Sequence, residues 1–518
     1  VWIREDLRID HNPALSYASQ NHEAVTALYI YNNKYFDKKR EAQKWWLFKS
    51  LETFKKDLTQ FNISLEVLSG DEIEIFSKIK EKDEITVYWS KVYEPDIIAK
   101  GKKIRDLFIK NKVNYKYFKG NILIEFQNVT KDDGTPFKVF TPFWKNAEKK
   151  YLEQIPPKIS KIDKLKKISN IMGKSIDLKE ILPKKNWYKK FEKYWEPSEN
   201  EAKKYLQELI KNKITDYGDT RDIPGINGTS KLSPFLKFGQ IHVETIWNKC
   251  DEVKKKGKGY RKYINELGWR EFSHSLINYF PEMLKGNLRK DFDNFPWVKN
   301  DKFIKKWKKG MTGYPIVDAG MRELYETGWM HNRVRMVVAS FLVKHLRIHW
   351  MEGEKHFRNC LMDFNEANNV AQWQWVAGCG ADAAPYFRIF NPILQGIKFD
   401  KDGIYTKTWI PELKNMPNDF LHKSASPPFH YDLGKKLIST KPGARICNVL
   451  PRGFGKSVLM KAAIMHKLCY ASKEDSMFMA WVAEEQGQSI DHVKYIRSHI
   501  EENDAIRYYF GNLCGGDE

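Results

Sequence analysis

The residue types that could do chemistry are concentrated in the stretch NNVAQWQWVAGCGADAAPYFRIF, which runs from Asn368 to Phe390. It combines two tryptophans and two asparagines with several glycines and alanines, a mixture that an ordinary helix interior does not need. Nine of the 17 tryptophans of the chain fall between Trp247 and Trp409. A buried indole needs a partner for its N–H, which makes tryptophan a costly core filler. A flat aromatic ligand or a stacked nucleobase explains this excess better than packing alone.

A second chemical motif, PRGFGKS, lies near the end of the printed sequence and is typical of a phosphate-binding loop. A strand expected at 446–450 precedes its glycines, and a helix expected from Lys456 onward follows them. In such a loop, backbone N–H groups surround phosphate oxygens, the lysine contacts the outer phosphates and the serine contacts magnesium. These positions are held by Gly453, Gly455, Lys456 and Ser457. No apolar strand ending in acidic residues follows, so we expect weak nucleotide binding at most and no hydrolysis.

Composition limits the classes of protein that can carry these motifs. The 518 residues are 42% hydrophobic and 30% charged, which favours folded domains over disorder. The beginning, VWIREDLRID, has no signal-peptide core, and the longest central apolar run, VVASFLV, is too short to cross a bilayer. Six cysteines lie without metal-ligand spacing, as in reduced cytosolic proteins. We therefore expect a cytoplasmic protein with no metal site and no membrane association.

The formal net charge of +22 indicates a polyanionic partner. Nucleic acid is the first candidate, because lysine and arginine contacts to phosphates release counterions on binding. A general lysine bias of the source proteome remains an alternative, because much of the lysine lies in runs such as KISKIDKLKKISN.

The elements that must position these residues change in type along the chain. Over residues 1–125, AVTALYIYN and EITVYWSKVY are typical of buried strands, and REAQKWWLFKSLETFKKDL is typical of an amphipathic helix. This alternation predicts an N-terminal α/β domain with a doubly wound parallel sheet. No Gly-x-Gly-x-x-Gly follows the first strand, so the usual dinucleotide site is not predicted there. A lysine-containing connector is expected over 126–199, and helical patterns dominate 200–421.

Residues 1–421 resemble DNA photolyases of the cryptochrome/photolyase family. Signatures in family order include VWIREDLRIDHNPAL, FKVFTPFWK, GTSKLSPFLKFG, NELGWREF and TGYPIVDAGMRELYETGWMHNRVRM, followed by the tryptophan-rich stretch. The resemblance implies an all-α domain that holds FAD and an α/β domain with space for an antenna chromophore of unknown identity. It also implies an enzyme, a deoxyribodipyrimidine photo-lyase. In that reaction, reduced FAD excited by blue light passes an electron to a cyclobutane pyrimidine dimer, the ring splits and the electron returns.

The resemblance assigns one set of residues to the flavin. Arg335 is implied as the ion partner of Asp363, and Asn369 as the amide that faces flavin N5. Many relatives carry an acidic residue where this chain has Asn365, whose amide can both donate and accept. The loop GTSKLS is implied to hold the FAD phosphates through hydroxyls and backbone N–H groups. The implied cofactor-binding residues are Tyr217, Thr229, Ser230, Lys231, Leu232, Ser233, Arg335, Asp363, Asn365 and Asn369.

A second set of residues is implied to bind UV-damaged DNA. A dimer must be flipped out of the duplex to be reached, and its weakened pairing makes this less costly. Trp269 and Trp375 are implied as an apolar wall, Glu266 as the partner of a base edge, and the arginines as phosphate contacts. The implied substrate residues are Arg221, Glu266, Trp269, Arg270, Asn332, Arg333, Met336, Trp375 and Gln395.

Three further tryptophans match the electron relay of the family. In order outward from the flavin, they are Trp373, Trp350 and Trp297. Indole can be oxidised, so stacked indoles can carry an electron inward from the surface. Without the resemblance, three core tryptophans are an equal alternative. These three residues, with Asn369 and Glu266, are the ones to which we assign catalytic roles.

The subclass and the tail complete the sequence-based expectations. The motif GWMHNRVRM has the pattern of cyclobutane dimer photolyases, and we expect a monomeric enzyme of class I. A cryptochrome-type blue-light sensor without repair activity is the alternative. Beyond a junction at 422–444, residues 445–518 resemble the ATPase domain of phage terminase large subunits, truncated to a partial α/β P-loop fragment. A DNA-packaging ATPase is therefore a further alternative, and we infer a fusion of two truncated genes.

Overall fold

The computed structural model describes residues 1–36, 40–80, 83–155, 159–168, 171–253, 257–383 and 389–421. The chain divides into two units, of which the first comprises Val1–Tyr386 and Pro392–His422. The fold and the site described below belong to the first unit. The predicted phosphate loop and the terminase-like segment around it lie outside the described residues.

The N-terminal domain is built on a five-stranded sheet in the order β3-β2-β1-β4-β5. The strands are β1 (Trp2–Ile3), β2 (Thr26–Tyr31), β3 (Ser64–Ser69), β4 (Thr86–Ser90) and β5 (Asn114–Phe118). All neighbouring strands pair in parallel. Parallel neighbours need crossover connections, and the crossover helices bury the faces of the sheet. The predicted doubly wound α/β domain is therefore confirmed.

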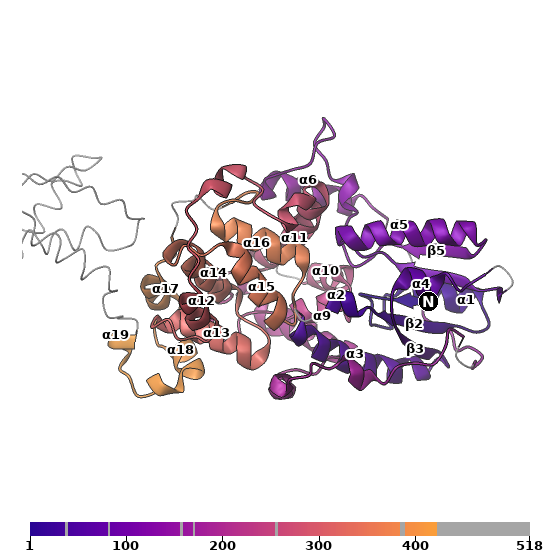
Figure 1. Cartoon of the computed structure of the whole chain (residues 1–518), viewed down its shortest axis with the longest axis horizontal. Coiled ribbons are helices and arrows are strands. Elements are labelled where there is room, and N and C mark those ends of the chain that lie inside the picture. The colour runs from indigo at the N-terminus through magenta and orange to yellow at the C-terminus, as the bar shows by residue number, and fades with distance from the viewer. Residues whose placement is uncertain are drawn as a thin grey trace, which may run out of the picture. The chain divides into compact units, whose positions relative to one another are not determined.

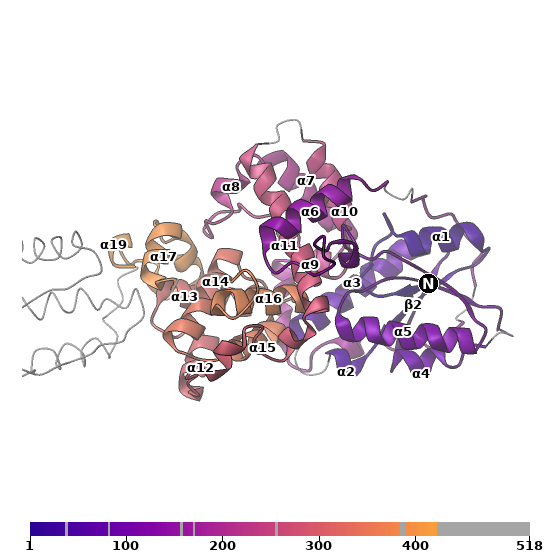
Figure 2. The same cartoon turned by 90° about the horizontal axis from the view of Figure 1, so that it is seen from above.

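Helices cover both faces of this sheet (Figure 2). They are α1 (Pro13–Asn21), α2 (Asn33–Phe36), α3 (Glu41–Thr59), α4 (Glu72–Phe76) and α5 (Pro95–Lys110). Successive side chains of a strand point to opposite faces, which divides the apolar residues between two cores. Tyr29 packs in the core that includes residues of α1 and α3, whereas Leu28 and Ile30 pack with residues of α4 and α5.

The strand order reverses at β1, whose neighbours are β2 and β4. In open parallel sheets, ligands bind outside the carboxyl ends of the strands at such a switch point. Arg4, which follows β1, donates a hydrogen bond to the carbonyl oxygen of Ser90 at the end of β4. Glu5 forms an ion pair with Lys237 of the helical domain. The switch point of the sheet is therefore in contact with the helical domain.

The predicted connector at 126–199 contains the helix α6 (Phe140–Leu152) as well as irregular chain. Its short 3-10 helices are η2 (Phe126–Asn128), η3 (Leu178–Ile181) and η4 (Asn186–Lys193). Trp144 of α6 lies against Gly268 of α11 (Lys258–Tyr279), where a Cβ atom would collide with the indole ring. The connector therefore braces the long helix α11, which carries several of the predicted site residues.

The rest of the described chain is helical, which confirms the predicted all-α domain. Its longer helices are α7 (Glu199–Glu208), α10 (Val243–Asp251), α11, α13 (Pro315–Thr327), α14 (Asn332–Ser340), α15 (Trp350–Cys360) and α16 (Glu366–Ala377). Its shorter helices are η5 (Leu209–Lys213), α8 (Tyr217–Thr220), α9 (Ser233–Lys237), η6 (Pro281–Leu284), η7 (Lys290–Asn294), α12 (Asp301–Lys308), η8 (Phe341–His345), α17 (Pro392–Phe399), α18 (Ile404–Trp409), η9 (Pro411–Leu413) and α19 (Asn418–Leu421).

The tryptophan-rich stretch forms α16, which contacts α11, α14 and α15 (Figure 1). The small residues that follow it end the helix: Gly378 is left-handed, with a φ of 93°, and its N–H bonds back to the carbonyl oxygen of Gln374. Only a residue without a Cβ adopts this conformation at little cost. The sequence pattern therefore places α16 among the helices of the domain and ends it with a sharp turn.

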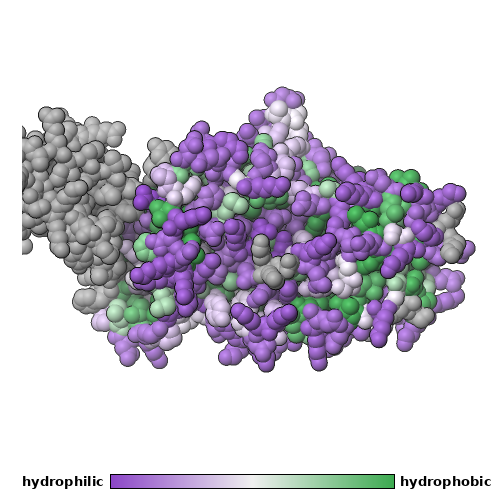
Figure 3. All heavy atoms as spheres, viewed as in Figure 1, coloured by the Kyte–Doolittle hydropathy of each residue, from purple (hydrophilic) through white to green (hydrophobic). Residues whose placement is uncertain are grey.

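The described surface is mainly polar (Figure 3), and the thiols of the described ranges are buried. Hydrophilic side chains cover most of the described surface seen in Figure 3. Within the described ranges, no helix combines the length and the apolar character needed to span a bilayer. The cysteines of these ranges, Cys250, Cys360 and Cys379, are free and buried.

Candidate functional site

A cavity of about 480 Å³ lies among helices α8, α9, α11, α14 and α16. It brings together residues from segments that are far apart in the sequence. The predicted site residues that line it are Tyr217, Arg221, Thr229, Ser230, Lys231, Leu232, Ser233, Glu266, Trp269, Arg270, Asn332, Arg333, Arg335, Met336, Asp363, Asn365, Asn369, Trp373 and Trp375. Trp297, Trp350 and Gln395 do not line this cavity.

One side of the cavity centres on the carboxylate of Asp363. Its Oδ2 accepts hydrogen bonds from Ser233 Oγ at 2.6 Å and from Arg335 Nη2 at 2.7 Å. Its Oδ1 is buried and has no hydrogen-bond partner among the described residues. A buried acceptor without a partner is costly, so this oxygen fits a donor supplied by a ligand, such as the ring N–H of a flavin. Trp329, which was not predicted, donates to Ser233 Oγ at 3.3 Å.

The loop at 229–233 borders the same side of the cavity. Lys231 has a φ of 53°, in the left-handed region that a lysine rarely adopts. Lys213 Nζ donates to the carbonyl oxygen of Thr229 at 3.1 Å and helps to hold this conformation. Burial lowers the pKa of the Lys231 ammonium. A strained loop with a cation and three hydroxyls suits the phosphates of a dinucleotide.

The amide of Asn369 has a defined orientation. Its Nδ2 donates to Glu354 Oε1 at 3.1 Å. An ionised carboxylate can only accept, so the NH₂ end must face Glu354, which leaves the amide oxygen for the cavity that Asn369 lines. Arg358 holds the same carboxylate oxygen at 2.8 and 3.1 Å. Sequence reasoning missed Glu354, because a glutamate within a helix carries no signal of such a role.

Asn365 caps a helix and also lines the cavity. Its side-chain oxygen accepts the N–H of Asn368 at 3.0 Å and caps the N-terminus of α16. An asparagine is among the preferred residues for this capping position. The departure from the acidic residue of many relatives therefore preserves the helix start at the cavity wall.

A second group of lining residues forms an aromatic wall, and we call it, with the charged residues beside it, the substrate side of the cavity. Trp269 stacks on Phe140 of α6, with ring centroids 3.9 Å apart and an interplanar angle of 6°. Trp375 is partly buried in the wall formed by α16. An indole backed by a second ring is held in place, which suits it to stacking against a flipped base.

Four charged side chains alternate in sign along the wall of this side. Arg221 forms an ion pair with Glu266 and lies 3.5 Å from Asp222. Arg333 Nη2 lies 2.6 Å from the other oxygen of Asp222. The two predicted DNA arginines are therefore already paired. Asp222 was not predicted, although it follows Arg221 in the motif YGDTRD.

Two other predicted substrate residues point to different surroundings. Arg270 pairs with the buried Glu271 at 3.0 Å and donates to the carbonyl oxygen of Asn121. The guanidinium thus fixes α11 to the chain that follows the sheet. Gln395 lies on α17 and does not line the cavity. Arg270 therefore lines the cavity while it is bonded to the fold, whereas Gln395 is not among the lining residues.

Of the three tryptophans of the predicted relay, Trp373 and Trp350 are buried and Trp297 is partly buried. Trp373 packs on Gly353, one turn beyond Trp350 in α15, where a Cβ atom would collide with the indole. His349 lies between the other two indoles, with ring centroids 5.0 Å from Trp297 and 5.6 Å from Trp350. Trp350 is 1% exposed, whereas Trp297 is partly buried. Among the three, Trp373 alone lines the cavity, and the order of the relay stays a prediction.

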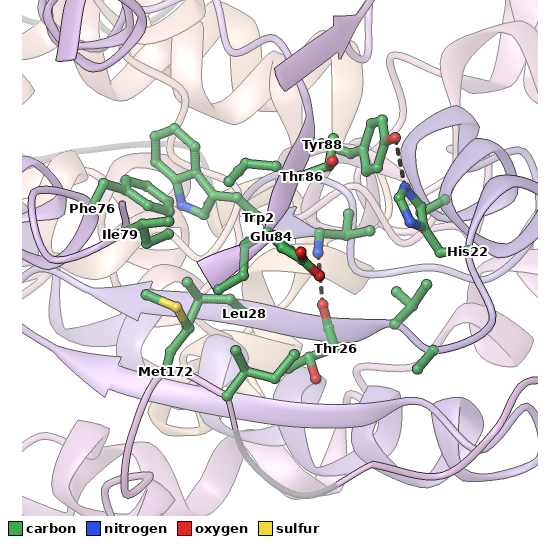
Figure 4. A pocket seen from close by; sticks show the side chains of 17 residues that line it. Trp2, His22, Thr26, Leu28, Phe76, Ile79, Glu84, Thr86, Tyr88 and Met172 are labelled. Carbon is green, nitrogen blue, oxygen red and sulfur yellow. Dashed lines mark hydrogen bonds between the residues drawn. The ribbon is translucent and has the colours of Figure 1, made fainter. Parts of the chain in front are cut away.

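A second cavity, of about 150 Å³, lies in the N-terminal domain (Figure 4). It is bordered by the amino ends of β1, β2 and β4 and by apolar side chains such as Trp2, Leu28 and Phe76. His22 is hydrogen bonded to Tyr88 at its edge, at 2.8 Å. Ligand sites of parallel sheets lie at the carboxyl ends of the strands. We therefore assign no antenna chromophore to this cavity.

A histidine cluster links the two domains. His11, His242 and Glu244 offer ligand atoms within 4.8 Å of one another. However, Lys119 pairs with Glu244, and both ring nitrogens of His242 have partners, the N–H of Glu244 and the carbonyl oxygen of Gly120, each at 3.2 Å. Burial lowers the pKa of His242, which favours the neutral ring. These contacts describe an interdomain hydrogen-bond cluster.

Comparison with known proteins agrees with this geometry. A family described as "DNA photolyase" matches residues 1–160, and one described as "FAD binding domain of DNA photolyase" matches residues 263–441. The second match passes residue 421, where we expected the resemblance to end. The deoxyribodipyrimidine photo-lyase of Agrobacterium fabrum is 39% identical over 439 residues, which cover 83% of this chain and 90% of the relative.

Two further relatives of this chain are a photolyase of known structure and a cryptochrome. The crystal structure of a class III photolyase from Agrobacterium tumefaciens matches with a TM-score of 0.77 and 36% identity, covering 90% of this chain and 96% of that one. Cryptochrome-2 of Arabidopsis thaliana is 31% identical over 82% of this chain and 72% of its own length. The identity to the first relative extends over nearly all of that protein, and the cavity residues expected from the resemblance are assembled. The chain belongs to the cryptochrome/photolyase family.

Proposed function

We propose that this protein is a light-dependent DNA repair enzyme, a deoxyribodipyrimidine photo-lyase that splits cyclobutane pyrimidine dimers. One observation carries this proposal. Asp363 and Asn369, on the flavin side, line the same cavity as Trp269, Trp375 and Glu266, on the substrate side. A cofactor and a flipped dimer bound in one cavity are close enough for electron transfer without a carrier. The relatives named photo-lyase support the same function.

FAD is the cofactor of this protein, and the residues present fit it. Asp363 supplies the unpartnered acceptor, Asn369 presents its amide oxygen, and Lys231 lies in the loop suited to phosphates. When bound, the reduced flavin supplies the electron that splits the dimer and accepts it back. The protein contributes binding and orientation, and the tryptophans Trp373, Trp350 and Trp297 provide the route by which the flavin is reduced.

UV-damaged DNA is the partner on which the residues of the other side act. Trp269 and Trp375 stack on the flipped bases and exclude water from them. Glu266, held by Arg221, accepts hydrogen bonds from a base edge. Arg333 contacts the backbone beside the lesion, as phosphate contacts position the duplex without reading its sequence.

The test is repair of a duplex oligonucleotide with one cyclobutane thymine dimer, measured under blue light and in the dark. Purified protein with bound flavin is expected to restore intact thymines only under light. A folded preparation without flavin absorbance, or one with flavin and no light-dependent repair, would contradict the proposal. The second result would favour a light sensor of the cryptochrome type, which the similarity to Cryptochrome-2 keeps as the alternative.

The subclass is a further part of the proposal. The sequence motifs favoured class I, whereas the solved structure reported above is a class III photolyase. We propose a cyclobutane dimer enzyme of class III type on that similarity. A duplex carrying a (6-4) photoproduct, expected to remain unrepaired, tests the substrate, and mass spectrometry of the molecule released on denaturation identifies any antenna chromophore.

A further inference from the structure

The charged residues on the substrate side form one chain of ion pairs. Glu266, Arg221, Asp222 and Arg333 follow one another, with the distances given above, and their formal charges sum to zero. All four line the cavity. Arg221 and Arg333, two of the three predicted DNA arginines, are therefore ion-paired in this structure rather than free cations.

Asp222 is the residue common to both arginines. One of its oxygens lies 3.5 Å from Arg221 Nε and the other 2.6 Å from Arg333 Nη2. Burial alone would raise the pKa of Asp222, but the hydrogen bond and charge of Arg333, with the charge of Arg221, lower it below its ordinary value. The carboxylate is therefore ionised at neutral pH and keeps its charge opposite both guanidinium groups.

The pairing fixes Arg333 as well as neutralising it. The guanidinium carbon lies 4.5 Å from the ring centroid of Phe399, so one face is stacked while the edge is bonded to Asp222. A side chain held in this way loses little rotamer freedom when it meets a phosphate. The phosphate, however, must share the guanidinium with a carboxylate and approach a negative charge.

This arrangement affects undamaged and damaged DNA differently. Nonspecific binding of an intact duplex comes almost entirely from phosphate contacts, so each cation that is neutralised weakens it. A flipped dimer also stacks against Trp269 and Trp375, and this stacking does not depend on Asp222. Neutralised arginines therefore reduce background binding more than lesion binding.

We propose that Asp222 is a specificity-determining residue, which lowers the affinity for undamaged duplex by holding Arg221 and Arg333 as ion pairs in the wall of the cavity. This inference rests on the proposed repair function, because it assumes that a dimer enters the cavity. Asp222 is thus a carboxylate, within a site for a polyanion, that discriminates between damaged and undamaged DNA.

The experiment measures dissociation constants in the dark, over a series of salt concentrations, for two duplexes of the same sequence, one with a single thymine dimer and one without. Asp222→Asn with bound flavin is expected to bind the undamaged duplex more tightly and to lose part of the preference for the dimer. The logarithmic salt slope for the undamaged duplex should steepen by about 0.9, the value for neutralisation of one additional phosphate.

Two matched variants separate this effect from simple charge. Glu23→Gln removes a carboxylate of the α/β domain that pairs with a lysine, Lys166, and does not line the cavity. Its net charge change equals that of Asp222→Asn, and it should leave the preference for the dimer unchanged. Arg333→Gln should weaken binding of undamaged DNA more in the Asp222→Asn background than in the parent, because only there is the arginine unpaired.

The outcomes are decisive in both directions. Unchanged affinity of Asp222→Asn for undamaged DNA, or an equal increase in Glu23→Gln, overturns the inference. Loss of dimer binding alone also overturns it, because Asp222 would then serve only lesion binding. A parent protein that does not prefer the dimer defeats the proposed function itself, which the same titration reveals. If Asp222→Asn does not retain flavin, Asp222→Ser provides the same charge change with a smaller side chain.

Discussion

The flavin side and the substrate side of the cavity are built on different principles. Around Asp363, polar groups are paired inside the fold, and one buried acceptor is left for a ligand. Around Asp222, which is 27% exposed, charged side chains pair with one another in the wall of the cavity. A resident cofactor needs a fixed cradle that matches it, whereas a transient polyanion needs charges that can be shared. If the two sides are independent, a change on one side should leave the function of the other side unaffected.

The largest expected effect follows from Asp363→Asn. The substitution places an NH₂ group or a neutral oxygen against Arg335 and leaves that arginine without its carboxylate. Loss of one partner of a buried pair costs about 3–5 kcal/mol, so the purified protein should contain little flavin. The ratio of flavin to protein absorbance measures this. Asp219→Asn on α8, where the side chain is exposed, is the control, and full flavin content in both variants would contradict the cradle.

Trp373→Phe should block light-driven reduction of the oxidised flavin while sparing repair by enzyme that has been reduced chemically. Phenylalanine is far harder to oxidise than indole, and Trp373 is the only relay residue among the three that lines the cavity in the described structure. The measurement is the rate of loss of oxidised-flavin absorbance under blue light. Trp307→Phe is the control for packing, because the ring centroid of Trp307 lies 6.3 Å from that of Trp373. An equal loss in that control would place the relay elsewhere.

On the substrate side, Trp269→Ala and Trp375→Ala should each weaken binding of a dimer-containing duplex by about 1–3 kcal/mol, the value of one base–aromatic stack. Binding of the undamaged duplex should change little, since its bases stay stacked within the helix. Titration of both duplexes checks this. A lower flavin content in either variant would show that the substrate side also supports the flavin side, and would contradict their independence.

The fold and the composition of the cavity were largely predictable, for physical reasons. Strands buried on both faces and the helical pattern from 200 onward leave periodic signals that any single sequence shows. The ordered motifs located Asp363, Asn369 and Trp269 because a cofactor and a lesion require those side-chain types. The pairing of Arg221 with Glu266, and the pairing of Arg270 with Glu271, were not predictable, because each depends on which way a helix faces once it is packed.

The same limit explains two of the residues that were missed, Glu354 and Asp222. Glu354 reaches Asn369 from another helix, and no spacing within the sequence relates them. Asp222 lies beside a predicted residue, but its importance comes from Arg333, more than a hundred positions away. Residues that bind a ligand directly can be found by type and motif, whereas residues that orient them require the tertiary structure.

Glu354 provides the finest test of the flavin side. By holding the NH₂ group of Asn369, Glu354 directs the amide oxygen to the cavity, where it can accept a hydrogen bond from N5–H of reduced flavin but not from the unprotonated N5 of oxidised flavin. The orientation should therefore favour the reduced cofactor. Removal of the Glu354 carboxylate also removes a negative charge, which by itself raises the reduction potential of the bound flavin. Loss of the hydrogen bond between flavin N5–H and the Asn369 amide oxygen lowers that potential.

Two variants of equal charge separate these effects. In Glu354→Gln the amide oxygen can still accept from Asn369 and Arg358, whereas Glu354→Leu offers no acceptor and frees the Asn369 amide to turn. The two-electron reduction potential of the bound flavin should be lower in Glu354→Leu than in Glu354→Gln by roughly 10–30 mV, the equivalent of one hydrogen bond of about 0.5–1.5 kcal/mol. Glu352→Gln, at a residue paired with Lys355 on the outer face of the same helix, should match the parent. Equal potentials in the Gln and Leu variants would show that Glu354 acts through its charge alone and does not orient Asn369.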